Sequence, residues 1–435
     1  MDRIVDLVRK KRDADELTLE EIERLINGYA RGEIQDYQMA AFLMAGACND
    51  FSEAEAASLT TAMLRCGQPL DLSGIKKPKV DTHSTGGVGD KVGIIAAPIA
   101  AAAGLAVPVI AEPGIGHVGG TLDKLRSIPS FRTDLTRDEF MEIVATHGLA
   151  FAAQSNELAP ADKKLYSLRD ATATVDSPAL IAASVMSKKM AEGLDALVLD
   201  VKVGRGSLLK SKTEARRLAQ LMITIGRRMN LRIQALLTDM DQPLGYTVGN
   251  ALEIMEASQT LQGQGPQDLA GLAVEVAARM IYLAKNDVSL ETARATAQGL
   301  LNDGSAFAVL QNVIRAQGGN ADALTQFELL PNASGEHIIT SPREGYISRI
   351  NADDIGRAAV LLGAGRDRMG DSIDPAVGII LQAKVGDAVA AGAGLCALYY
   401  TDETQLTEAV QLVEDAFRLS SNQPEPRDLV LDLVQ

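Results

Sequence analysis

Four polar side chains in the middle of the chain have the types and spacing of an anion-binding site. Tyr166 and Arg169 are three residues apart, and Ser184 and Lys188 are four apart, so each pair falls on one face of a helix. A lysine on an otherwise apolar face is costly unless its ammonium meets an anion or water. The structural alternative is that Arg169 pairs with Asp162 or Asp170, and that Lys188 extends into solvent. Spacing by itself favours this alternative.

Two glycine-rich segments are the other candidates for chemistry. Residues 81–93 read DTHSTGGVGDKVG, and residues 111–125 read AEPGIGHVGGTLDKL. Each follows a strand-like run and leads toward a helical pattern, and the backbone N–H groups of such a turn can bind an anion. For one turn alone, a tight connection without a ligand is an equal alternative. Because each segment carries one of only four histidines, His83 and His117, the two together predict one site at the carboxyl edge of a sheet.

The elements that position these residues change character along the chain. About the first 65 residues are apolar at helical spacing, and capping boxes start helices at Thr18 with Glu21 and at Ser52 with Glu55. A small helical lobe is therefore predicted. From about residue 79 onward, β-rich apolar runs at 107–110, 196–203 and 233–240 alternate with helical segments. This alternation is typical of a parallel or mixed sheet covered on both faces.

The last hundred residues differ again. Short strand-like runs punctuated by Gly and Asp follow residue 335, with one helix after them, and part of the pattern resembles a biotinyl/lipoyl-type β-hammerhead. No lysine is placed for a swinging-arm cofactor, so a scaffold role is expected. The predicted fold class is α/β plus an all-α lobe, with a central mixed or parallel α/β sheet domain and a C-terminal α+β hammerhead-like subdomain. The boundaries are 1–70 for the helical lobe, completed by 158–193, then 75–157 and 194–330 for the α/β domain, and 335–435 for the last subdomain, with 318–335 as a linker.

Composition limits the class of protein. The chain has 435 residues, 46% of them hydrophobic, which is ample for several cores. A net charge of −15 argues against a nucleic-acid binder, which needs a basic face. No apolar run is long enough for a membrane span, so a soluble protein is expected. Cys48, Cys66 and Cys396 lack metal-type spacing and are expected to be buried thiols in the reducing cytoplasm.

Taken together, the motifs resemble the pyrimidine-nucleoside phosphorylase family, which includes thymidine phosphorylases. The resemblance covers the whole chain and is most specific in the strings HSTGGVGDK, GHVGGTLDKL, SKKMAEGLDALVLDVKVG and VLLGAGR. It implies a homodimer built through the helical lobes and a cleft that closes over a pyrimidine nucleoside. No nucleic-acid or membrane partner is implied.

The resemblance assigns five residues to the pyrimidine base, namely His83, Tyr166, Arg169, Ser184 and Lys188. Cleavage of the glycosidic bond leaves an electron-rich base and an oxocarbenium-like sugar. The cationic side chains can stabilise charge on the carbonyl oxygens of the base, while His83 can donate a hydrogen bond or a proton near the ring. Ser184 can read the N3/O4 edge.

The phosphate pocket departs from the family pattern. Thr82 stands where the family has Lys, Gly93 where a hydroxyl is usual, and residues 111–120 replace two hydroxyls and an Arg while adding Glu112. What remains for an acceptor is Ser84, Thr121 and the glycine backbone, with Thr82 and His117 nearby. Charge-assisted hydrogen bonds contribute about 1.5–3 kcal/mol each, and a carboxylate near 4 Å adds roughly 4 kcal/mol of repulsion at an effective dielectric of 20. Phosphate is therefore expected to bind poorly.

Three functions follow from this mismatch. The first is cleavage of pyrimidine nucleosides with water slightly favoured as acceptor, which Glu112 or His117 would orient or deprotonate. The second is phosphorolysis to pentose 1-phosphate with a rebuilt phosphate site. The third is a non-catalytic nucleoside-binding paralogue. The choice between water and phosphate is close.

The resemblance also raises one cofactor, a potassium ion. Broader-specificity relatives bind it through main-chain oxygens near the glycine turn and one carboxylate, a donor set suited to a weakly held hard ion. The matching positions here are Gly89, Lys91, Leu244, Thr247 and Glu256. The alternative is that Glu256 is an acid on a helix surface. No other cofactor is implied.

Overall fold

The N-terminal domain is a lobe of four helices. The computed structural model describes residues 3–111, 114, 119–154, 158, 160–285, 287–366 and 371–435. Its first helices are α1 (Ile4–Arg12), α2 (Leu19–Ala30), α3 (Asp36–Asn49) and α4 (Glu53–Arg65). The predicted capping boxes begin α2 and α4, with Thr18 accepting from the Glu21 N–H and Ser52 from the Glu55 N–H. Buried Glu55 also pairs with Lys11 at 2.8 Å and so joins α4 to α1.

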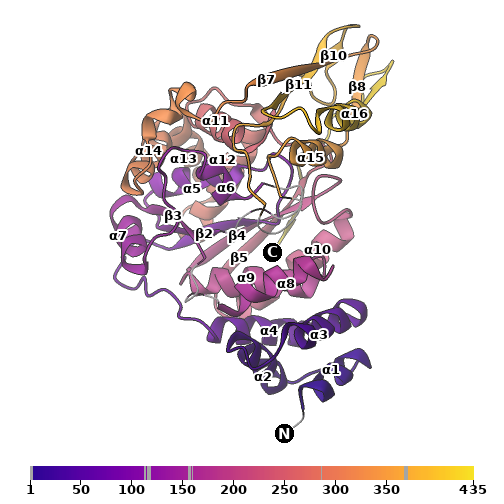
Figure 1. The fold of residues 1–435 in the computed structure, drawn as a ribbon. Helices are drawn as coiled ribbons and strands as arrows, with labels where there is room; N and C mark the ends of the chain where they lie inside the picture. Colours follow the sequence, from indigo (N-terminus) through magenta and orange to yellow (C-terminus); the bar gives the residue numbers. More distant parts are fainter. Residues whose placement is uncertain are drawn as a thin grey trace.

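Two later helices complete this lobe and form the floor of the site. They are α8 (Pro160–Ala171) and α9 (Pro178–Ala191), and they pack on α2, α3 and α4. Helix α9 ends just before Gly193, whose φ of +71° is the left-handed conformation that a glycine adopts without strain. In Figure 1 this lobe lies below the sheet, with α8 and α9 between the sheet and the N-terminal helices.

A four-stranded mixed sheet forms the centre of the molecule, which confirms the predicted class. Its strands are β1 (Val80–Ser84), β4 (Ala196–Val203), β5 (Arg232–Asp239) and β13 (Val430–Val434), in that order. The first three are parallel, and β13 is antiparallel to β5. Every residue of β4 is buried, because helices α5 (Val92–Ala102) and α12 (Gln267–Ala284) cover one face and α10 (Lys212–Arg228) covers the other.

A second parallel pair extends the site beyond β1. It consists of β2 (Val107–Ala111) and β3 (Leu149–Ala153), and a bridge between Lys79 and Ala106 joins it to the edge of the central sheet. The surrounding helices are α6 (Thr121–Leu125), α7 (Arg137–His147), α11 (Asn250–Leu261), α13 (Leu290–Asn302) and α14 (Ser305–Ala316). The segment expected to be a linker contains two short 3-10 helices, Ala321–Leu324 and Phe327–Leu329.

The C-terminal α+β domain is built on two small sheets. Its elements are β7 (Gly335–Thr340), β8 (Gly345–Ile350), α15 (Ala352–Leu361), β9 (Gly378–Leu381), β10 (Ala388–Val389), β11 (Gly394–Tyr400), α16 (Leu406–Ala416) and β12 (Phe417–Ser420). Helix α15 was not expected, since one helix was predicted there. The short strand β6 (Thr247–Val248) pairs with β9 and so ties this domain to the central one.

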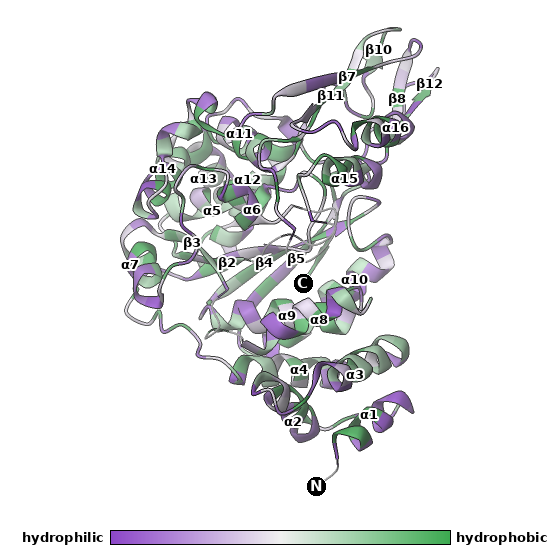
Figure 2. Ribbon diagram, viewed as in Figure 1, coloured by the Kyte–Doolittle hydropathy of each residue, from purple (hydrophilic) through white to green (hydrophobic). Residues whose placement is uncertain are grey.

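Hydropathy follows these layers (Figure 2). The strands of the central sheet are largely apolar, whereas the outer helices carry hydrophilic residues on one side. No helix within the described ranges is long and apolar enough to cross a membrane. All three cysteines are free thiols, but only Cys396 is buried. Cys48 is exposed on α3, contrary to expectation.

Candidate active site

One cavity of about 400 Å³ lies where the helical lobe meets the carboxyl ends of β1 and β2. This position follows from the fold, because the carboxyl ends of parallel strands and the turns after them form the usual ligand-binding edge of an α/β sheet. Eight of the predicted site residues line it, which are Thr82, His83, Ser84, Thr121, Tyr166, Arg169, Ser184 and Lys188. Glu112 and His117 lie outside the residues that the structure describes.

The floor of the cavity carries the residues expected to contact a base. Tyr166 and Arg169 project from α8, while Ser184 and Lys188 project from α9, as their spacing predicted. The Lys188 ammonium donates a hydrogen bond of 3.1 Å to the Ser184 hydroxyl and lies 5.2 Å from the centre of the Tyr166 ring. A cation, a hydroxyl and an aromatic ring therefore face the same space, a set that can hold a planar polar ring.

The aspartate pairing differs from the structural alternative considered for this site. Lys188 does not extend into solvent. It is buried and forms an ion pair of 3.0 Å with Asp162. The Arg169 guanidinium donates from Nη2 to the Val175 carbonyl at 2.8 Å. Because Asp162 and Lys188 come from different helices, their pairing fixes α8 against α9 and holds the ammonium in position.

His83 stands at the end of β1, beside the base-contacting residues. Burial, followed by the positive charges of Lys189 and Lys188, holds the pKa of His83 well below its ordinary value of 6.5. The imidazole is therefore uncharged near neutral pH. It can donate a hydrogen bond from its N–H group, but a role as proton donor requires an imidazolium that this environment disfavours.

A buried ion cluster that sequence reasoning missed lies behind His83. The Lys189 ammonium bonds Asp81 at 2.5 Å, Glu192 at 2.7 Å and the Ile110 carbonyl at 3.1 Å. Although burial opposes the charge, the two carboxylates raise the pKa of Lys189. The cluster joins α9 to β1 and β2. The sequence contained one signal for this cluster, the adjacent lysines Lys188 and Lys189. Neighbouring residues on a helix point in different directions, so these two lysines cannot both lie on one polar face.

The other end of the cavity has no such cations. Its lining includes Ser84, Gly86, Gly120 and Thr121, with no Lys or Arg among the described residues there. Ser84 Oγ donates to Asp90 and accepts from the Gly86 N–H at 3.1 Å. The Thr82 hydroxyl donates to the Val198 carbonyl at 3.0 Å and is thus engaged by the sheet.

Two cations lie just beneath this end. Burial opposes ionisation of Asp90, but the charges of Lys202 and Lys124 outweigh it and lower the pKa of Asp90. Lys124 bonds the Asp90 carbonyl at 2.5 Å and Glu253 at 2.7 Å. Lys202 bonds Asp200 at 2.6 Å. The site thus holds an ionised carboxylate at its surface with its compensating cations underneath.

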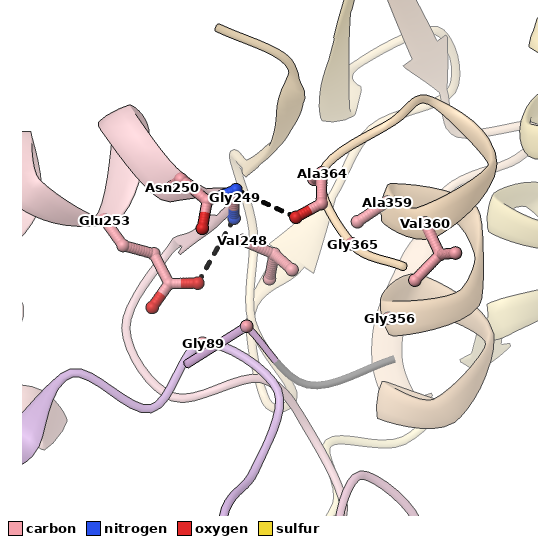
Figure 3. A pocket seen from close by; sticks show the side chains of 11 residues that line it. Gly89, Val248, Gly249, Asn250, Glu253, Gly356, Ala359, Val360, Ala364 and Gly365 are labelled. Atoms are coloured by element: carbon pink, nitrogen blue, oxygen red, sulfur yellow. Dashed lines mark hydrogen bonds between the residues drawn. The ribbon is translucent and has the colours of Figure 1, made fainter. Parts of the chain in front are cut away.

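The C-terminal domain reaches this end through Arg366. Its guanidinium forms a two-pronged pair with Asp123 of α6, at 2.9 and 3.0 Å, and Asp123 also accepts from the Gly114 N–H at 2.7 Å. A second cavity of only about 10 Å³ lies nearby, where α15, the start of α11 and the glycine turn meet (Figure 3). There the Asn250 amide donates to the Ala364 carbonyl at 2.8 Å.

The residues predicted to bind a potassium ion lie close together, but their arrangement does not suit such an ion. The Lys91 ammonium lies among the oxygens that would hold it, with Leu244 O at 3.2 Å, Thr247 O at 3.0 Å and Glu256 Oε2 at 2.5 Å. An ion placed among these atoms would meet a like charge. Glu256 is buried on α11, and so it is not the surface acid of the alternative interpretation. The described residues hold no group of three or more His, Cys, Asp or Glu suited to a metal.

Comparison with family models covers most of the chain. Residues 5–67 match the glycosyl transferase family helical bundle domain, and residues 76–307 match the glycosyl transferase family a/b domain. Residues 346–420 match the pyrimidine nucleoside phosphorylase C-terminal domain.

Individual proteins resemble the chain over its whole length. A pyrimidine-nucleoside phosphorylase from Geobacillus stearothermophilus is 45% identical, covering 99% of this chain and all of the relative. One from Bacillus subtilis is 44% identical, covering 98% of each chain. Among solved structures, anthranilate phosphoribosyltransferase from Thermus thermophilus superposes with a TM-score of 0.57 over 72% of this chain and all of that one. At 20% sequence identity, this similarity indicates a shared fold and nothing further.

Proposed function

Because this chain belongs to the pyrimidine-nucleoside phosphorylase family, we propose that it cleaves pyrimidine nucleosides with inorganic phosphate as the acceptor. The products are the free base and a pentose 1-phosphate. The observation that carries this proposal is full-length similarity to phosphorylases at 42–45% identity. The expectation that water is the preferred acceptor is not supported, since these relatives are named for transfer to phosphate.

The geometry of the floor supports the pyrimidine half of the reaction. A phosphate oxygen bonds to C1′ as the bond from C1′ to the base nitrogen breaks, and the electron pair of that bond goes to the base. Arg169 and Lys188 stabilise the negative charge that collects on the carbonyl oxygens of the base. Uncharged His83 donates a hydrogen bond to the same ring. Tyr166 and Ser184 orient it.

The acceptor end supports weak phosphate binding. Hydroxyls of Ser84 and Thr121 and the backbone of the glycine turns line it, without a Lys or Arg side chain in the described part. One missing charge-assisted contact lowers affinity about ten- to a hundredfold. The buried ammonium groups of Lys124 and Lys202 are already paired with Asp90, Glu253 and Asp200, so they add little attraction for a phosphate. We therefore expect the KM for phosphate to be high for a pyrimidine-nucleoside phosphorylase.

The deciding experiment measures turnover of uridine, thymidine and 2′-deoxyuridine in phosphate-free buffer and again with added phosphate. Pentose 1-phosphate formed only when phosphate is present supports the proposal. Free pentose released at a rate independent of phosphate would overturn it in favour of hydrolysis. Binding of nucleosides without turnover in either buffer would instead identify a binding protein.

The proposal extends to assembly as a homodimer through the helical lobe. Helix α3 buries Met39, Phe42 and Leu43 on one face, yet its opposite face is also apolar. Tyr37 is 73% exposed and Met44 is 41% exposed there, in line with exposed Ala41 and Cys48. A helix that is apolar on both faces requires a second partner. A second copy of the lobe satisfies this, and the three free thiols suit the reducing cytoplasm.

A further inference from the structure

The ammonium of Lys91 occupies the centre of a ring of oxygen atoms. Four lie within 3.2 Å, namely the carbonyls of Leu244 and Thr247, the Thr247 hydroxyl and one carboxylate oxygen of Glu256. The Lys91 side chain is completely buried, and that of Glu256 is 4% exposed. A buried carboxylate and two carbonyls that converge on one point are the donor set of a monovalent cation site.

The ring is held in place around that point. The second Glu256 oxygen accepts from the Tyr246 N–H at 2.8 Å, so that the carboxylate is fixed at both ends. Gly89 lies directly against the same carbonyls. A Cβ atom added there would come within 2.7 Å of the Leu244 oxygen and 3.1 Å of the Thr247 oxygen. In Figure 3 the Gly89 turn lies beside Glu253 and the start of α11, the helix that carries Glu256.

The oxygen ring is also connected to the active site, because Lys91 adjoins residues that line the cavity. Lys91 immediately follows Asp90, and Val92 and Gly93 come next in the chain. All three of these neighbours line the acceptor end of the cavity. The charge that binds the oxygen ring therefore also fixes the first glycine turn. A second ammonium, from Lys384, bonds the Pro243 carbonyl at 2.5 Å and the Gly245 carbonyl at 2.7 Å, so residues 243–247 are held from two sides.

We propose that Lys91 is a built-in monovalent cation, which makes the protein independent of potassium. A side-chain ammonium has three N–H donors and one positive charge, so it can satisfy the carbonyls and neutralise Glu256 as a bound ion does. Unlike a free ion, it is covalently attached and cannot dissociate. Removal of the side chain down to Cβ is expected to leave a space that a potassium ion fills.

The first test compares the wild-type protein in equal concentrations of potassium chloride and choline chloride. Turnover and melting temperature are expected to be the same in both salts. A rise in either that is specific to potassium would overturn the proposal. The melting temperature needs no turnover, so this result is independent of whether the acceptor is phosphate or water.

The second test uses the variants Lys91→Ala and Lys91→Met. In choline chloride both lose stability, because buried Glu256 loses the ammonium with which it is directly paired. Potassium is expected to raise the melting temperature of Lys91→Ala by roughly 2–4 °C, since binding to the folded state alone stabilises it. Lys91→Met keeps most of the volume and is expected to gain nothing beyond the choline control. An equal response of both variants, or none from Lys91→Ala, would contradict the proposal.

A third variant ties the effect to the ring. Glu256→Gln in the Lys91→Ala background removes the only carboxylate among the four oxygens. The potassium-specific rise is then expected to disappear. If it persists, the ion binds elsewhere and Lys91 does not take its place.

Discussion

His83 lies between a cavity and two lysines, and its environment determines its protonation state. The cluster around Lys189 places a permanent positive charge behind the imidazole, and Lys188 places another beside it. The sequence identified His83 as a site residue, because it precedes a glycine turn. It could not reveal that the side chain is uncharged, since that depends on residues about a hundred positions away.

The stability of the protein is expected to depend on His83 below pH 6.5. An unfolded chain takes up a proton on this residue near that pH, whereas the folded chain, with its lowered pKa, does not. The unfolded state therefore binds more protons, and stability falls as the pH drops through 6.5. His83→Asn removes this contribution, so its melting temperature should fall less than that of the wild type between about pH 7.5 and 5. His337→Asn, at an exposed position on β7, is the control and should follow the wild type.

Adjacent lysines on α9 are expected to have separable effects. Lys188→Met removes a charge from the floor of the cavity and should lower kcat/KM about 10²–10³-fold, the range for loss of one group that stabilises developing charge. Because it also leaves Asp162 buried without its cation, it is expected to lose stability as well. Lys189→Met leaves Asp81 and Glu192 buried without their cation and should cost about 3–5 kcal/mol of stability. Its kcat/KM should fall less than tenfold. Steady-state kinetics and denaturant unfolding of both variants check this, and equal losses of kcat/KM would contradict the assignment.

At the scale of elements, local signals were reliable and long-range pairings were not. The capping boxes of α2 and α4 formed as predicted, because N-cap and N3 residues interact within one turn. Helix α15 was missed because Gly356, a poor helix former, interrupts its apolar pattern. The pairing of α8 with α9 through Asp162 and Lys188 was also missed, since spacing does not determine which acid an amine meets.

The exposed apolar face of α3 gives a prediction for assembly. The variant Tyr37→Glu/Met44→Glu places two charges on that face and should convert a dimer to a monomer in sedimentation equilibrium. Tyr282→Glu, at an exposed aromatic position on α12, should leave the dimer intact. A wild-type monomer, or a double variant that remains dimeric, would exclude this face as the interface.

At the scale of the whole molecule, the three-part architecture was predictable from the changes of pattern along the chain. The connections between the parts were not, because strand partners and ion pairs across domains leave no local signal. Strand β6 pairs with β9 more than a hundred residues later, and Arg366 crosses from the C-terminal domain to Asp123. Such contacts bring a domain that is distant in sequence to the acceptor end of the cavity.

Loss of the Arg366 contact is expected to affect the acceptor more than the nucleoside. In Arg366→Ala, Asp123 loses its two-pronged partner, and its hydrogen bond to the Gly114 N–H becomes less fixed. The KM for phosphate should rise about tenfold, the effect of one lost charge-assisted contact, with a smaller change in the KM for uridine. Arg366→Lys should recover only part, because an ammonium cannot form the same fork. Arg294→Ala, which breaks a surface pair with Glu275, is the control, and a parallel rise of both constants would contradict this role.

The strand β13 has a consequence for how the protein is made. It completes the central sheet by covering the open side of β5, yet it follows β5 by about 190 residues in the chain. At translation rates of about 5–20 residues per second, the ribosome needs roughly 10–40 s to supply it. During that interval a buried, apolar strand presents unpaired N–H and C=O groups to every other nascent chain nearby. Slow synthesis at low concentration should therefore favour the native yield, and a chaperone that shields this edge should favour it further.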